Sequence, residues 1–262
     1  MSSRNPVLRK IDAPVVSDEE LARIVNGPSV AGQASFVDVI SKTAIIFALI
    51  VVGAIYGWTT SVTTSFDGTY SYSNTGVILT AMIVALVTGI VNAFKKNVSP
   101  ALVLIYGAAE GILLGAISHW IDLAYGPGIA QQAVIATMVV FGLMLGLYKS
   151  RIIKVNGKFM KMFTIAMISY FVIAIASFIS SLFGVGQGWG FFGVGQIGML
   201  LCVFGVGLAA FSLVVDFEVT TQALAAGVPQ REAWRLAFGL VVSLVWLYTE
   251  LLRLLAIVNG RD

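Results

Sequence analysis

The chain alternates between long apolar runs and short polar connections. Seven runs are each close to the ~20 residues that a helix needs to cross the hydrocarbon core of a bilayer. They cover residues 43–62, 76–94, 100–121, 129–148, 160–183, 193–217 and 233–258. The alternation of apolar and polar positions typical of membrane barrel strands is absent from them. The pattern therefore predicts an all-α, polytopic membrane helix bundle with seven transmembrane helices.

The residues before the first apolar run are polar and are interrupted by three prolines. The stretch SDEELARIV from Ser17 has the capping pattern of a short helix with acidic residues in its first turn. We therefore predict two parts. Residues 1–41 are expected to form a partly ordered cytosolic N-terminal tail, and residues 42–262 are expected to form the seven-helix transmembrane domain.

Lysine and arginine residues gather in alternate connections. Fourteen of the sixteen lie in the N-terminal tail and in the second, fourth and sixth connections, while the first, third and fifth connections contain none. Because positive charge is retained on the cytoplasmic side, a cytoplasmic N-terminus is predicted. Arg253 and Arg261 at the C-terminal end leave a second topology open, with six spans and a re-entrant seventh segment.

Composition supports a membrane protein and argues against several other classes. The chain is 58% hydrophobic and 11% charged, with a mean hydropathy of +0.93, whereas about 25% of a soluble domain is charged. Its basic residues lie at the ends of apolar runs, so the net charge of +3 predicts topology and not nucleic-acid binding. No nucleophile and base are spaced as in an enzyme, and His119 has no second histidine or cysteine for a zinc set. We therefore expect no enzyme activity, no resident metal and no cofactor.

Two further motifs have structural interpretations. Cys202 lies within an apolar run and is expected to be a small buried side chain. The glycine-rich run between residues 184 and 195 lacks the lysine and hydroxyl residue of a phosphate-binding loop, and we expect a flexible outer loop.

Three acidic residues, Glu110, Asp216 and Glu250, fall within or at the end of apolar runs, and only Arg253 lies near enough to offset them. A charged side chain at the centre of a membrane helix costs about 2.5 to 3.5 kcal/mol on insertion scales, so such residues usually face the protein interior and mark ion or proton routes. Carboxylates that share a site titrate as a pair, which makes the site sensitive to pH without histidine.

Each acid also has a structural interpretation. Glu110 follows Gly107 on a helix face next to a ridge of small residues, where it could bond a neighbouring helix. Asp216 could mark the cytoplasmic end of its helix. Glu250 and Arg253 are three residues apart and could pair on one face. Each of these interpretations accounts for a single acid.

Several segments of the chain resemble those of a known membrane-protein family. The segments FKKNVSPALVLIYGAAEGILLGAISHW, GLAAFSLVVDFEVTTQAL and VVSLVWLYTELLRLLAIV, with RNPVLRK near the start, are similar to the Bax inhibitor-1 family and its bacterial YccA-like branch. The resemblance implies a multi-pass protein of the cell inner, or plasma, membrane, with the last helix central to the bundle. It also implies a pH-sensitive calcium leak governed by a carboxylate pair, here Asp216 in VVDF and Glu250 in LYTE.

Helix geometry opposes a direct contact within that pair. If the chain turns near residues 227–229, Asp216 lies about 12 residues before the turn and Glu250 about 22 after it, a mismatch in depth of roughly 15 Å. The two meet only if one helix bends, tilts or breaks. Glu110 lies ~15 Å into its own helix and is an alternative partner for Glu250.

The residues and the resemblance together support two functional hypotheses. The first is a pH-sensitive calcium leak in which Asp216, Glu250 and Glu110 form a gate, with Ca²⁺ as the transported ion. The second is a regulator without enzyme activity, acting through contacts with a membrane protease or another membrane protein. A proton-coupled transporter also accounts for the acids, although the hydropathy pattern has no inverted repeat.

Overall fold

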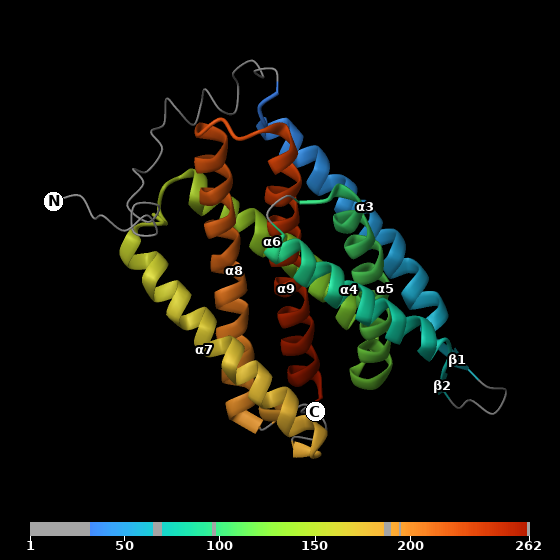
Figure 1. Ribbon diagram of the computed structural model, residues 1–262. Coiled ribbons are helices and arrows are strands. Elements are labelled where there is room, and N and C mark those ends of the chain that lie inside the picture. Colours follow the sequence, from blue (N-terminus) through green and yellow to red (C-terminus); the bar gives the residue numbers. More distant parts are fainter. Residues whose placement is uncertain (1–31, 65–69, 96–97, 186–189, 194, 261–262) are drawn as a thin grey trace.

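The computed structural model describes residues 32–64, 70–95, 98–185, 190–193 and 195–260 (Figure 1). Seven of its helices are long and apolar enough to cross a membrane, which confirms the all-α polytopic fold. A short antiparallel hairpin joins the first two. In chain order the elements are α3 (Phe36–Ser61), β1 (Val62–Thr64), β2 (Tyr70–Tyr72), α4 (Thr75–Phe94), α5 (Pro100–Tyr125), α6 (Ile129–Lys149), α7 (Gly157–Leu182), η2 (Gly190–Gly193), α8 (Gly195–Ala225), η3 (Gln230–Glu232) and α9 (Ala233–Asn259).

Helix α3 begins at Phe36, so the expected domain boundary at residues 41 and 42 falls inside it. A capping box explains this start. The Ser35 hydroxyl accepts a hydrogen bond from the backbone N–H of Asp38 at 3.1 Å, and the Asp38 carboxylate accepts one from the backbone N–H of Ser35 at 3.0 Å. The short helix expected from Ser17 lies outside the described residues.

The segment before α3 is attached to the turn between α8 and α9. The backbone N–H of Ala34 donates to the carbonyl of Val228 at 2.8 Å, and that of Gln230 donates to the carbonyl of Gly32 at 3.1 Å. Ala34 is buried with Leu224 and other apolar residues of this turn. Residues 32–41 therefore pack as part of the bundle.

The last helix lies in the middle of the bundle, as expected. Helix α9 packs against α3, α5, α6 and α8, and Figure 1 shows it between α8 on one side and α3 to α5 on the other. It is one continuous helix of 27 residues, ~40 Å long, which is enough to span a bilayer. The re-entrant alternative for this segment is therefore not supported.

The ridge of small residues on α5 packs against α3, as its spacing predicts. A Cβ atom at Gly111 would overlap the backbone of Ile50, and one at Gly115 would overlap the carbonyl group of Ala54. Gly53 of α3 makes the reciprocal approach to the carbonyl of Ala108. Glycine is required at these positions because the two backbones are in direct contact.

The second and sixth connections, which are both basic, lie together at one end of the bundle. The guanidinium of Arg231 donates to the carbonyl of Val98 at 3.2 Å, and that of Arg235 donates to the carbonyl of Lys95 at 3.0 Å. The start of α5, the end of α8 and the start of α9 therefore share this end, together with the start of α3 (Figure 1). We refer to it as the basic end, and its placement in the cytoplasm remains a prediction.

The described part of the glycine-rich connection is packed against the bundle, so the expectation of a flexible loop was wrong for residues 190–193. They form η2, in which Phe192 is 6% exposed and meets the ring of Tyr170. The backbone N–H of Phe191 donates to the Ser177 hydroxyl at 3.0 Å. Phe192 explains this packing, because its ring gives the connection an apolar surface to bury.

Candidate functional site: carboxylates within the bundle

Asp216 lies inside α8, at its interface with α9. The structural interpretation of Asp216 as the end of its helix was wrong, since α8 continues to Ala225. The extension is explained by burial of Phe217, Thr221 and Leu224 after the acid. The Ser243 hydroxyl of α9 donates a hydrogen bond to the Asp216 carboxylate. This half-buried acid therefore links two helices through a neutral partner.

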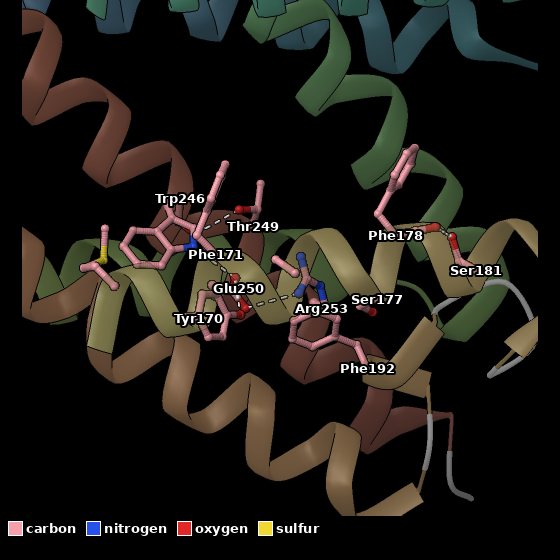
Figure 2. Close-up of a pocket in the computed structure, with 12 residues that line it drawn as sticks. Tyr170, Phe171, Ser177, Phe178, Ser181, Phe192, Trp246, Thr249, Glu250 and Arg253 are labelled. Atoms are coloured by element: carbon pink, nitrogen blue, oxygen red, sulfur yellow. Dashed lines mark hydrogen bonds and ion pairs between the residues drawn. The ribbon is translucent and has the colours of Figure 1, made fainter. Parts of the chain in front are cut away.

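Glu250 lies on α9 and is 2% exposed. Its Oε1 atom accepts hydrogen bonds from the Tyr170 hydroxyl at 2.7 Å and from the Trp246 indole N–H at 3.0 Å. Its Oε2 atom accepts no hydrogen bond and lies 3.5 Å from the Arg253 guanidinium (Figure 2). Glu250 and Arg253 therefore form the ion pair that their spacing allows, as in the structural interpretation of this acid. The guanidinium also lies over the Phe192 ring, 4.4 Å from its centroid.

Asp216 and Glu250 are not brought together. Asp216 lies beside Gly239 and Ser243 of α9, whereas the Glu250 carboxylate lies beside Gly205 of α8. Gly205 and Asp216 are separated by ~16 Å along α8, which agrees with the mismatch expected from helix lengths. Both helices are continuous, so no bend brings the acids to one level.

Glu110 is half-buried on α5, and it has no hydrogen bond or ion pair with any residue that the structure describes. It follows Tyr106 by one helical turn, and the Tyr106 ring packs edge-on against Phe238 of α9. The Glu250 carboxylate instead contacts α7 and α8, so the alternative pairing of Glu110 with Glu250 is not formed.

Asp216 lies at about the same depth as Glu110, whereas the sequence resemblance pairs Asp216 with Glu250. Glu110 lies ten residues after the start of α5, and Asp216 nine residues before the end of α8. Both helix termini are at the basic end, so each acid is ~15 Å along its helix from that end, a distance of about half the ~30 Å thickness of a hydrocarbon core. Glu250 is 17 residues after the start of α9, or ~25 Å from that end.

A fourth acid, Glu218, is also buried in the bundle, which the apolar pattern does not predict. It is 5% exposed and accepts hydrogen bonds from the Tyr148 hydroxyl of α6 at 3.1 Å and from the Gln222 amide at 2.8 Å. The apolar run ends at residue 217 in the sequence, so hydropathy predicts Glu218 outside the membrane. Its spacing of four residues from Gln222 is a helical pairing signal that indicates a longer helix.

Other candidate residues have structural partners. His119 stacks on Trp58, with ring centroids 4.8 Å apart, and its Nδ1 atom lies 3.1 Å from the Ser61 hydroxyl. Asp122 accepts hydrogen bonds from the backbone N–H groups of Gly128, the N-cap of α6, and of Ala130 in its first turn. Within the described ranges, no group of three or more His, Cys, Asp or Glu side chains is placed to hold a metal ion.

The fold and the buried carboxylates define the class of the protein: a multi-pass, α-helical integral membrane protein with acids inside its bundle. A family profile described as Bax inhibitor 1 like matches residues 5–260, so the chain belongs to this family. A comparison with curated proteins gives no match.

Proposed function

We propose that this membrane protein is a pH-sensitive, calcium-permeable cation leak of the YccA-like branch, in which Asp216 and Glu110 are the principal gating groups. The observation that carries this proposal is their common depth. Both acids lie ~15 Å from the basic end along helices that pack against α9, and neither has an ion-pair partner among the described side chains. Unpaired acids at that depth are costly, which favours a functional reason for them.

The carboxylate oxygens of these acids are suitable ligands for Ca²⁺, and their protonation would make the site sensitive to pH. Ca²⁺ prefers carboxylate and carbonyl oxygens, and an ionised carboxylate attracts it. Protonation removes that charge, and it also changes the bond between Asp216 and Ser243 that joins α8 to α9. We therefore propose that flux falls as the pH is lowered. Glu250 has a smaller part in this proposal, because Arg253 already offsets its charge.

Calcium flux into proteoliposomes across a pH series tests the gate. Asp216→Asn and Glu110→Gln are each expected to flatten the pH dependence and to lower flux at neutral pH by about tenfold, equivalent to ~1.4 kcal/mol of lost cation interaction. Glu250→Gln is expected to have a weaker effect. Glu232→Gln at the basic end is the matched control and should retain the wild-type profile. Wild-type pH profiles in all three bundle variants would refute the gate.

The attachment of the tail to the α8–α9 turn supports a second candidate function, regulation of a membrane protease or another membrane protein. Deleting residues 1–31 leaves that attachment intact and removes the preceding segment. Loss of binding to a membrane protease with unchanged calcium flux would favour regulation. Altered flux with retained binding would favour the leak.

A further inference from the structure

A cavity of about 530 Å³ opens between α7 and α9, at the end of the bundle opposite to the basic end (Figure 2). Its polar lining consists of Ser177, Ser181, Thr249, Glu250 and Arg253, with the Tyr170 hydroxyl and the Trp246 indole. Its apolar lining includes Met167, Phe171 and Ala174. Arg253 is the only basic side chain among the lining residues that the structure describes.

Arg253 and the apolar residues Met167 and Phe171 line different parts of the cavity. Arg253 is 20 residues after the start of α9, ~30 Å along that helix from the basic end. A length of ~30 Å equals the thickness of the hydrocarbon core, so Arg253 is expected near the opposite headgroup region. Met167 and Phe171 are ten and six residues before Ser177 on α7, or ~15 and ~9 Å along the helix from it. The cavity therefore has a cationic side chain at its outer end, beside Phe178 and Phe192, and an apolar wall on α7 that runs inward from it.

The Arg253 guanidinium is oriented by Phe192, Glu250 and Cys202 and still has donors that face the cavity. One face lies over Phe192, and its contact with Glu250 is a single approach at 3.5 Å, longer than a charge-assisted hydrogen bond. The Arg253 side chain retains 26% exposure. Arginine presents a planar set of donors that suits phosphate, and the stacking fixes the plane in which those donors point.

We propose that this cavity is a binding site for a phospholipid of the leaflet opposite to the basic end, with the lipid phosphate on Arg253 and one acyl chain along Met167 and Phe171. The volume accommodates a headgroup and the first part of a chain, and the rest of the chain continues along the exposed face of α7. Phe171 and Phe178 are 66% and 67% exposed on that face. This inference does not depend on the proposed calcium flux.

Native mass spectrometry of the full-length protein in detergent tests the site. The probes are phosphatidylglycerol, diacylglycerol with the same chains, and glycerol phosphate. We expect phosphatidylglycerol to bind at least about tenfold more tightly than either fragment, because a hydrogen bond to a charged group contributes about 1.5 to 3 kcal/mol. Equal binding of glycerol phosphate would indicate a free-anion site, and equal binding of diacylglycerol would indicate a chain-only groove. Either result would overturn the proposal.

Substitutions at two positions, Arg253 and Ala174, separate the headgroup contact from the chain contact. Arg253→Gln should weaken phosphatidylglycerol binding about tenfold, and Arg253→Lys should restore part of it, because the charge returns without the planar donor set. Ala174→Trp fills the apolar part and leaves Glu250 and Arg253 intact, so it should weaken binding without disturbing their pair. Lys158→Gln, an exposed position near the start of α7, is the control. Wild-type affinity in both Arg253→Gln and Ala174→Trp would refute the site.

Discussion

Replacing Gly115 by alanine is expected to destabilise the bundle by about 3 kcal/mol or more, a larger effect than a single methyl group normally has. The added Cβ atom would overlap the carbonyl group of Ala54 in α3, and backbone cannot move aside as a side chain can. Overpacking of a core by flexible groups costs about 1 to 3 kcal/mol, so a backbone obstacle places the cost at the top of that range or above it. Unfolding in mixed micelles, titrated with denaturing detergent and followed by circular dichroism, measures the change.

Gly142→Ala on α6 is the matched control, since a Cβ atom there meets nothing within 4 Å. Alanine favours a helix over glycine by up to about 1 kcal/mol, so this variant should be neutral or slightly stabilised. The same change from glycine to alanine is thus expected to lower the stability of the protein at position 115 and to leave it unchanged or raise it at position 142. Equal stabilities of Gly115→Ala and Gly142→Ala would contradict the close contact of α3 with α5.

Replacing Glu250 by alanine is expected to destabilise the protein by about 2 to 4 kcal/mol. The change leaves the Tyr170 hydroxyl and the Trp246 indole without their acceptor, and it removes the ion-pair partner of Arg253. Each unsatisfied buried donor costs about 1 to 3 kcal/mol, and breaking a buried ion pair costs about 3 to 5 kcal/mol. The partial exposure of Arg253 reduces the second contribution. The same micelle titration provides the measurement.

Glu250→Gln separates the hydrogen bonds from the charge. Its amide oxygen still accepts from Tyr170 and Trp246, so this variant should lose less than half as much stability as Glu250→Ala. The variant Arg253→Gln removes the other charge and should be partly rescued when combined with Glu250→Gln. An alanine variant as stable as the wild type would mean that Glu250 does not hold α7 and α9 together.

The candidate site was only partly predictable, and the reason differs from one residue to the next. The spacing of Glu250 and Arg253 predicted their pairing, because side chains three apart on a helix are neighbours whatever surrounds them. Ser243 as the partner of Asp216 could not be predicted. That contact depends on the register of α8 against α9, which is set by packing along both helices and by the turn between them.

Residue type and local spacing determined the seven helices, their approximate limits and the glycine ridge of α5, because the bilayer requires apolar length and helix contact requires small residues. Tertiary structure alone decided which acid meets which partner, that Glu218 is buried, and that a cavity opens between α7 and α9 beside Arg253. These features depend on the relative rotation and depth of helices far apart in the chain, and hydropathy carries no information about either.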